Sequence, residues 1–392
     1  MTLFYYHVLC KIPASVDSSK QIFQTLKQSK YMAINTAKEV IIPTTPNILR
    51  TVFLYTGQGD TTLLAIPEST TTASYKFIMI DSDLDKEKDE VNLVELLKDL
   101  LGNGELPIFI NTHPHNDHIG GIKKIYDEVG IKEVWHSNHR PKGKHKEGFE
   151  ELEYVLKKIG KNNEFHLKGT NDKNKIRKSD KDETEITKIL GLIDYQVFSP
   201  AEYVCDDIAE ESDDTHYNRI HEHCAVMKFT HNGKSILFTG DADKKAWKEH
   251  ITDYHGDNLA SNVMTASHHG SRTAFKTKEE DKESYKEHLE KINGTYLVIS
   301  APKQEDSPHG HPNDDALEIY KEFYEDENIY HLGEEPYCVI VDIDVNGAIS
   351  VSTDKKLIES YGKDSKKKDQ SKTSNKDQVF AGLASYAKPW GI

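Results

Sequence analysis

Four side chains of metal-binding type fall within six residues, directly after an apolar run. The run is 107–110, and the side chains are those of His113, His115, Asp117 and His118. Imidazole and carboxylate groups suit zinc and similar cations, and four of them in so short a loop are too many for core packing. Chance polar residues in a surface loop are the alternative interpretation. We therefore predict that a buried strand ends here in a metal-binding loop.

Two later segments repeat this arrangement, in which an apolar run leads into a polar loop. Asp241 follows the run 235–239, and the adjacent His268 and His269 follow the run 262–266. Either segment alone is a weak signal, because a Gly-Asp turn after a strand is common and paired histidines occur both on surfaces and in cores. Since the three segments share one architecture, we expect them to converge on one edge of the fold.

Apolar runs of strand length alternate with segments of helical periodicity through the middle of the chain. The predicted strands are 52–55, 62–66, 77–80, 107–110, 226–230, 235–239, 262–266, 295–300, 338–343 and 348–351. The predicted helices are 90–101, 279–292 and 314–324. Because strands that alternate with helices build a sheet with helices on its faces, this pattern predicts an α/β fold.

Composition divides the chain into three parts. Residues 1–50 form an N-terminal extension of unknown role, with a strand expected over 3–9 and a helix over 18–32. Residues 51–355 form the main domain, and 356–392 form a C-terminal tail that we expect to be partly flexible.

A charge-dense insertion over about 138–190 separates the early motif from the later ones. Charge runs usually face water, which favours a solvated helical flap. Long insertions in compact domains also carry binding roles, so a lid or a substrate-recruiting surface is the alternative.

The chain carries 50 basic and 65 acidic side chains, for a formal net charge of -15. This balance argues against a protein that grips nucleic acid over its whole surface, although it allows a local basic groove. The four cysteines show no CxxC spacing, which fits a reducing compartment. The chain has no secretory leader pattern and no apolar stretch near the ~18 residues that span a bilayer. We therefore expect a cytoplasmic protein outside the membrane.

These motifs resemble the metallo-β-lactamase superfamily, whose mark is the HxHxDH segment found here at 113–118. Within that superfamily, the chain is most similar to the hydrolase domain of ComEC-type DNA-uptake proteins. Four further segments carry the narrower resemblance: TGQGD at 56–60, IDS at 80–82, SHHGS at 267–271 and GHP at 310–312. The resemblance covers about residues 51–355 and implies a four-layer αββα metallo-β-lactamase sandwich with N- and C-terminal extensions.

The same resemblance implies two divalent metal ions, with zinc expected and manganese as the alternative. His113 and His115 would bind the first ion, and Asp241 would bridge the two. The remaining ligands of the second ion would be Asp117, His118 and His268.

The sequence leaves the third histidine of the first ion open. ComEC-type proteins often have Asn in that region, whereas this chain offers His216, His221 and His223. We expect at most one of His221 and His223 to bind the ion, and a position in a surface loop is the alternative for each. A second departure is Asp83, which stands where the family often has Gly after the acidic motif.

Other residues would act around the ions. Asp117 would orient the attacking water, and Asp60 or Asp81 would hold a ligand histidine by its second ring nitrogen. His311 would protonate a leaving alkoxide or stabilise its charge; alternatively, it only precedes a helix capped by Asn313. The residues expected to face a phosphate are His269, Ser271 and Arg272.

This chemistry predicts a metal-dependent hydrolase in which a metal-activated water is the nucleophile. We expect phosphodiester substrates, as for a nuclease or a nucleotide phosphodiesterase, so nucleic acid or nucleotides are the expected partners. One alternative is a metallohydrolase of thioesters, lactones or β-lactams, because hydrolases of all these classes share the HxHxDH segment. The other is a non-catalytic, metal-stabilised binding or regulatory protein.

Overall fold

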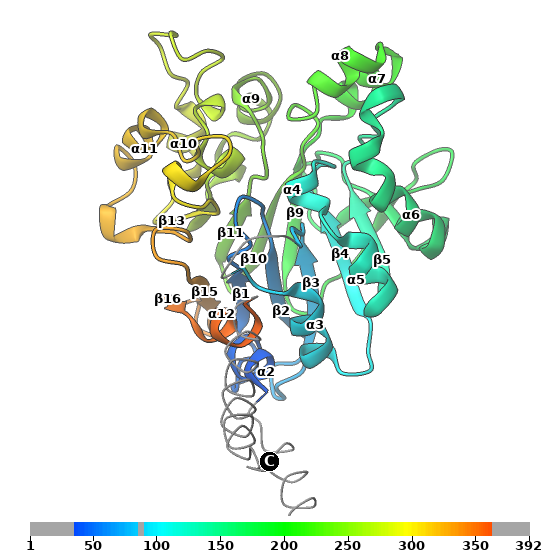
Figure 1. Ribbon diagram of the computed structural model, residues 1–392, viewed down its shortest axis with the longest axis vertical. Helices are drawn as coiled ribbons and strands as arrows, with labels where there is room; N and C mark the ends of the chain where they lie inside the picture. The colour runs from blue at the N-terminus through cyan, green and yellow to red at the C-terminus, as the bar shows by residue number, and fades with distance from the viewer. Residues whose placement is uncertain (1–34, 85–89, 363–392) are drawn as a thin grey trace, which may run out of the picture. The chain divides into compact units, whose positions relative to one another are not determined.

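A computed structural model describes residues 35–84 and 90–362 of the chain. The described residues from Thr36 onward belong to one compact unit, drawn in Figure 1. The strand expected over 3–9, the helix expected over 18–32 and the tail beyond 362 lie outside the described residues. Within the described ranges, no helix is both long and apolar enough to cross a bilayer.

Ten strands form the first sheet, in the order β16-β15-β1-β2-β3-β4-β5-β6-β7-β8. Neighbouring strands from β3 to β6 are parallel, and the other neighbours are antiparallel. The bounds are β1 (Leu49–Phe53), β2 (Thr62–Pro67), β3 (Tyr75–Ile80), β4 (Leu106–Asn111), β5 (Ile131–His136), β6 (Glu164–His166), β7 (Lys175–Lys178), β8 (Glu185–Thr187), β15 (Cys338–Ile343) and β16 (Ile349–Asp354). All of β2 and nearly all of β4 are buried, as expected of strands covered on both faces.

Six strands form the second sheet, in the order β14-β13-β12-β11-β10-β9. Neighbours from β11 to β14 are parallel, whereas β10 is antiparallel to both β9 and β11. The bounds are β9 (Asp194–Ser199), β10 (Val226–His231), β11 (Lys234–Phe238), β12 (Val263–Thr265), β13 (Tyr296–Ile299) and β14 (Ile329–His331).

Helices flank the strands on both sides (Figure 1). The helices beside the first sheet are α2 (Thr36–Ile41), α3 (Leu93–Leu101), α5 (Ile122–Glu128), α6 (Glu150–Ile159) and α12 (Lys356–Tyr361). The helices beside the second sheet are α9 (Thr252–His255), α10 (Glu287–Ile292) and α11 (Asp314–Lys321). Three short helices lie among the loops toward the top of Figure 1: α4 (Asn116–Ile119), α7 (Glu202–Glu210) and α8 (Asp213–Asn218).

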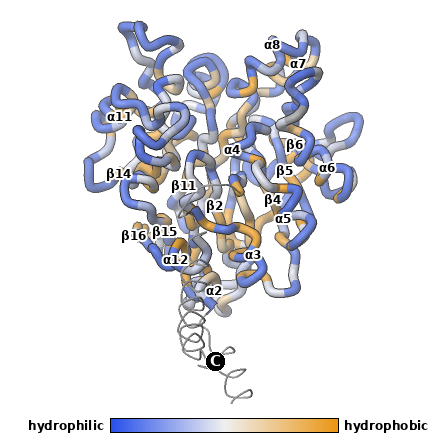
Figure 2. Tube along the Cα trace, viewed as in Figure 1, coloured by the Kyte–Doolittle hydropathy of each residue, from blue (hydrophilic) through white to orange (hydrophobic). Residues whose placement is uncertain are grey.

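Two apolar clusters hold these layers together. One joins the two sheets and the helices of the first sheet, and in it the rings of Phe53 and Phe238 lie 6.0 Å apart between the sheets. The other packs the second sheet, for example at Leu237, against Leu289 of α10 and Ile319 of α11. Apolar residues accordingly gather in the strands and on the inner sides of the helices, while the outer loops are hydrophilic (Figure 2). The expected four-layer αββα sandwich is therefore confirmed.

The structure differs from the sequence prediction in the insertion over 138–190. We expected a helical flap, but its only α-helix among the described residues is α6, and β6, β7 and β8 extend the first sheet instead. These strands are short and rich in charged residues, so they lack the apolar runs by which the longer strands were found. The helix expected over 279–292 is also shorter and begins at Glu287, because Asp281 accepts hydrogen bonds from the backbone of Thr277 and Lys278 in a turn before it.

Candidate metal centre

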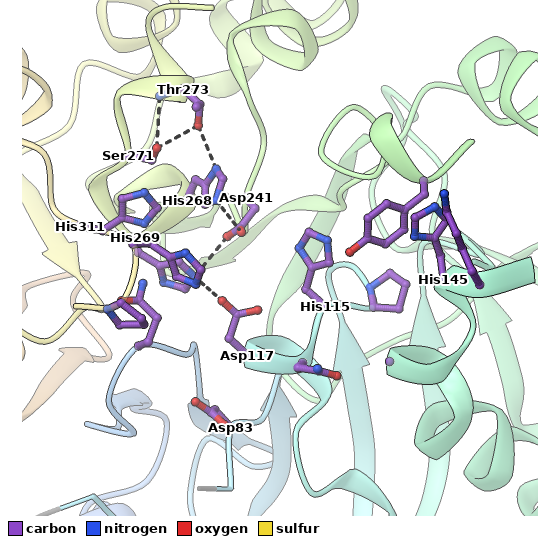
Figure 3. Close-up of a pocket in the computed structure, with 18 residues that line it drawn as sticks. Asp83, His115, Asp117, His145, Asp241, His268, His269, Ser271, Thr273 and His311 are labelled. Atoms are coloured by element: carbon purple, nitrogen blue, oxygen red, sulfur yellow. Dashed lines mark hydrogen bonds and ion pairs between the residues drawn. The ribbon is translucent and has the colours of Figure 1, made fainter. Parts of the chain in front are cut away.

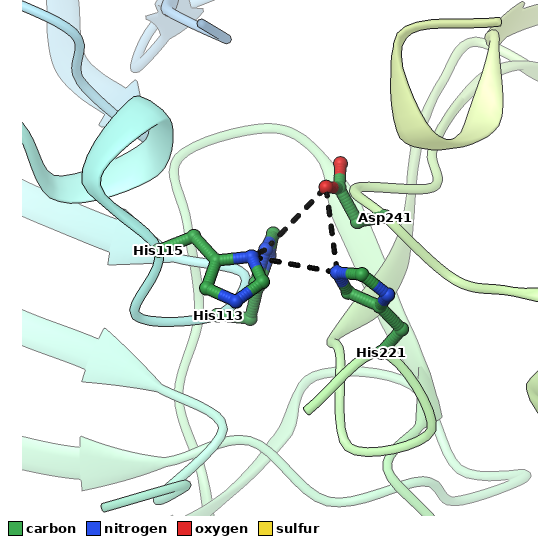
Figure 4. A group of neighbouring side chains, drawn as sticks. All are labelled: His113, His115, His221 and Asp241. Carbon is green, nitrogen blue, oxygen red and sulfur yellow. Dashed lines mark hydrogen bonds and ion pairs between the residues drawn. The ribbon is translucent and has the colours of Figure 1, made fainter. Parts of the chain in front are cut away.

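Three histidines and one carboxylate converge at the end of β4 (Figure 4). Nδ1 of His115 lies 3.0 Å from Nε2 of His113 and 3.4 Å from Nε2 of His221. Oδ2 of Asp241 lies 3.5 Å from Nε2 of His113 and 3.8 Å from Nε2 of His221. All four potential ligand atoms fall within 4.8 Å of one another. We call these residues the first donor group.

A second set of donors lies on the other side of the same carboxylate. Nε2 of His118 lies 3.2 Å from Nε2 of His269, and Oδ2 of Asp117 lies 3.5 Å from the latter nitrogen. Oδ1 of Asp241 is 3.2 Å from Nε2 of His118 and 3.6 Å from Nε2 of His269. We call Asp117, His118 and His269 the second donor group. Asp241 thus turns one oxygen to each group.

Local backbone geometry places these side chains. Asp241 follows Gly240, whose φ of +45° and whose contact with the Cys224 sulfur, 2.6 Å from where a Cβ would stand, exclude a larger residue. His268 and His269 both have left-handed backbone angles, with φ of 52° and 56°. Such angles are uncommon outside glycine and often mark functional sites. The tight turn directs the ring of His269 toward His118.

Asp81 orients the histidines from beneath. Its Oδ2 lies 2.9 Å from Nδ1 of His118 and accepts a hydrogen bond from Oγ1 of Thr112 at 2.6 Å. The same Thr112 oxygen lies 3.2 Å from Nδ1 of His113. With Nδ1 of His118 bound to a carboxylate, Nε2 of that ring is left as the electron-pair donor. Asp60 lies farther off, 3.5 Å from Nδ1 of His269, whose nearer partner is the carbonyl oxygen of Ser300 at 2.9 Å.

The charges of the buried groups favour a cation at this point. Burial works against the charged form of His118, but the carboxylates of Asp241 and Asp81 outweigh it and raise its pKa well above the ordinary value. Burial alone would raise the pKa of Asp241, yet His268 and His118 bring it well below the usual range. Burial and the charge of His118 lower the pKa of His113. The centre thus combines ionised carboxylates with neutral imidazoles, which are the forms that bind metals.

The donor set fits two divalent cations. Oδ1 of Asp241 is buried and accepts no hydrogen bond from any described residue. A buried carboxylate oxygen without a donor is costly in a folded protein, and a cation on that side would satisfy it. Nitrogen and carboxylate oxygen ligands suit zinc, and manganese accepts carboxylates and imidazoles as well.

Residues 81–289, more than half of the chain, match the family model of the metallo-beta-lactamase superfamily. The chain belongs to the metallo-beta-lactamase superfamily. Members of this superfamily are mostly metal-dependent hydrolases, which agrees with the αββα sandwich and the two donor groups described above. None of the curated proteins compared with the chain matches it.

Several solved structures resemble the chain at low sequence identity. The metallo-beta-lactamase fold protein YhfI from Bacillus subtilis is 11% identical over 78% of this chain and 100% of its own, with a TM-score of 0.39. The metallo hydrolase Igni18 from Ignicoccus hospitalis is 14% identical over 77% of this chain and 98% of its own, with a TM-score of 0.38. The short form of human tRNase Z is 10% identical over 72% and 95%, with a TM-score of 0.32. Because these TM-scores are low, the assignment to the superfamily depends on the family model.

Within this superfamily centre, the two adjacent histidines take places other than those expected. We expected His268 among the ligands of the second ion, but His269 lies with Asp117 and His118. His268 is held at Nδ1, 2.9 Å from Oγ1 of Thr273, and its Nε2 lies 3.4 Å from Oδ2 of Asp241. His268 therefore stands beside the shared carboxylate, facing the cavity.

Two further expectations are corrected by the structure. His223 points away from the first donor group, because its ring nitrogens lie 3.0 Å from Nδ1 of His139 and 3.0 Å from the sulfur of Cys205. The third histidine of the first donor group is accordingly His221. Arg272 was expected to face a phosphate, but its guanidinium pairs with Asp315 and Glu279.

A cavity of about 810 Å³ opens above both donor groups (Figure 3). Most of its lining comes from segments that the sequence had singled out: Gln58, Asp83, Pro114, His115, Asn116, Asp117, Asp241, His268, His269, Ser271, Thr273 and His311. Lys144 and His145 also line it, and they belong to the lysine-rich start of the insertion. Tyr217 was not anticipated, since a single tyrosine in a polar helix carries no sequence signal.

Proposed function

We propose that this protein is a metal-dependent hydrolase of phosphodiesters, either a nuclease or a nucleotide phosphodiesterase. The observation that supports it most strongly is Asp241, which turns one carboxylate oxygen to each of two donor groups below an open cavity. His113, His115 and His221 would hold one ion, with zinc expected, and Asp117, His118 and His269 would hold the other. When bound, such a pair lowers the pKa of water toward neutrality and stabilises both the attacking and the leaving oxygen.

The lining of the cavity favours an anionic substrate. Among the described residues that line it, none has an aliphatic side chain. An acyl chain of a thioester or lactone would find no apolar surface there, whereas pockets for apolar groups are lined mainly by hydrophobic residues. Side chains that can donate hydrogen bonds to phosphate oxygens are present instead: Lys144, Ser271, Thr273, His309 and His311. The resemblance to ComEC-type hydrolase domains supports the same choice.

Two residues of the chain itself would assist the reaction. Asp117 lies at the edge of the second donor group and lines the cavity, so its free oxygen would accept a hydrogen bond from the attacking water and orient it. His311 also lines the cavity, and its Nδ1 is buried without a hydrogen-bond partner among the described residues. The proton of this imidazole would stabilise the charge that develops on a phosphate or leaving oxygen.

The proposal is tested by a substrate panel with the purified protein loaded with zinc or with manganese. Single-stranded DNA, RNA and a cyclic dinucleotide are compared with thioester, lactone and β-lactam substrates. We expect hydrolysis of at least one phosphodiester, loss of that activity with a chelator, and loss of at least about a hundredfold in His113→Ala, because a ligand of the first donor group is missing. Faster turnover of an ester or a β-lactam than of every phosphodiester would reject the proposed substrate class.

A further inference from the structure

One wall of the cavity takes no part in the chemistry proposed above. It is formed by Pro114 from the loop after β4, His145 from the start of the insertion and Tyr217 from α8. The rings of His145 and Tyr217 are parallel, with an interplanar angle of 3° and centroids 4.1 Å apart. Tyr217 also meets His115 edge-on at 5.8 Å. A flat aromatic surface therefore begins one ring away from the first donor group.

The protein holds this wall in place without help from a substrate. Oδ1 of Asp214 in α8 lies 2.8 Å from Nε2 of His145 and 2.9 Å from Nζ of Lys144. Gly143 has a φ of +54°, and a Cβ there would lie 2.5 Å from a carboxylate oxygen of Asp213, so the turn lies tightly against α8. A binding surface that is ordered in advance loses less conformational entropy when a ligand binds.

The charge of the wall suits a group attached to a phosphate. Its carboxylate, Asp214, is paired with Lys144 and His145, and Lys144 itself lines the cavity. Planar rings bind well against aromatic side chains whatever their sequence identity, because every nucleobase has a π-face. The distance from the wall to the donor groups is bridged by His115 alone, which matches a base on the nucleotide next to the reacting phosphate.

We propose that the His145–Tyr217 wall binds a nucleobase adjacent to the phosphodiester that is cleaved. This inference rests on the proposed function and names a subsite for it. The wall would select nucleotide substrates over phosphodiesters without a base, and it would do so through KM more than through kcat, because the ring is bound before and during the reaction.

The test uses a dinucleotide and its two abasic analogues, in which a base-free sugar replaces one nucleoside or the other. Steady-state kinetics are measured for the metal-loaded full chain and for Tyr217→Ala, Tyr217→Phe and the exposed surface control Tyr254→Ala. For the intact dinucleotide, we expect Tyr217→Ala to raise KM at least about fivefold, in line with the contribution of one base–aromatic stack, and Tyr217→Phe to restore it. One of the two abasic analogues should show the raised KM already with the wild type and no further rise with Tyr217→Ala.

Two measurements separate this inference from its neighbours. Metal content is determined for each variant, and His145→Ala, which removes the second ring of the stack, should give a rise in KM similar to that of Tyr217→Ala at unchanged metal content. Equal rises for the dinucleotide and for both abasic analogues would overturn the inference, as would an unchanged KM in both alanine variants. If the wild type cleaves none of the three substrates while it hydrolyses an ester, the proposed function itself fails.

Discussion

His221 and His223 stand two residues apart, and their rings nevertheless serve different parts of the molecule. The ring of His221 lies at the first donor group, whereas that of His223 lies between His139 and Cys205. Both follow α8 in an irregular turn, where side-chain direction has no fixed period. The sequence could therefore limit the third histidine to a pair, but only the folded backbone distinguishes its members.

Alanine variants of these two histidines form a matched pair. We expect His221→Ala to lose about one metal ion per chain and at least about a hundredfold in kcat/KM, because a ligand of the first ion is gone. We expect His223→Ala to keep both ions and to lower the free energy of unfolding by about 1 to 3 kcal/mol, since it leaves a buried partner without its hydrogen bond. Elemental analysis and denaturant titration measure both effects. Equal metal loss in the two variants would contradict the assignment.

Asp81 and Asp60 provide a second comparison at this scale. Asp81 contacts His118 directly and reaches His113 through Thr112, so Asp81→Asn should weaken metal binding by about 10- to 100-fold. Asparagine tolerates the positive φ of 53° at this position, so the backbone should not be strained by the change. Asp60→Asn should have the smaller effect, because Ser300 supplies the nearer partner of His269. Competition with a chromophoric chelator measures both affinities, and the opposite ranking would show that Asp81 does not orient the ligands.

At the scale of elements, the long apolar strands and the loops that follow them were predictable. The runs 107–110, 235–239 and 262–266 correspond to β4, β11 and β12, and each leads into a donor of the centre. Such strands are legible because covered faces require continuous apolar residues. The short strands β6, β7 and β8 were missed because charged pairs, which leave no periodic pattern, accompany them. In that region the side chain of Glu183 contacts His166 and Lys168.

This charged region should make stability depend on acid. The hydrogen bond from His166 is the main cause that lowers the pKa of Glu183 to about 2, below the ordinary 4.5. Because the folded pKa is the lower one, the contribution is present above about pH 4.5 and is lost as the pH falls toward 2. We expect Glu183→Gln to be less stable than the wild type by about 2 kcal/mol at pH 6, with the gap closing in that window. Denaturant titrations at several pH values measure it, and a gap that stays constant down to pH 2 would show that the ion pair contributes nothing.

At the scale of the whole described unit, the centre lies where both sheets end. His113, Asp117 and His118 come from the loop after a strand of the first sheet, and Asp241 and His269 come from loops of the second. The sequence predicted this convergence from the shared arrangement of strand and loop. It could not predict the cavity wall, because the turn of the insertion and α8 meet only through the packing of Asp214 and Tyr217.

Ions that join two sheets should also stabilise them against each other. A ligand present at 100 times its dissociation constant adds about 2.7 kcal/mol to the folded state, which corresponds to a rise in Tm of about 5 to 10 °C for a chain of this size. We therefore expect a chelator to lower the Tm of the wild type by that amount in a calorimeter. Asp241→Asn, which weakens both sites, should respond much less, and an equal drop in both proteins would point to ions bound elsewhere.

The central claim is that two cations share Asp241, and anomalous diffraction from crystals of the zinc-loaded protein measures their positions directly. The account predicts two peaks on opposite sides of the Asp241 carboxylate. One should lie among His113, His115 and His221, and the other among Asp117, His118 and His269. A single peak, or peaks remote from Asp241 in crystals with full zinc occupancy, would contradict the account.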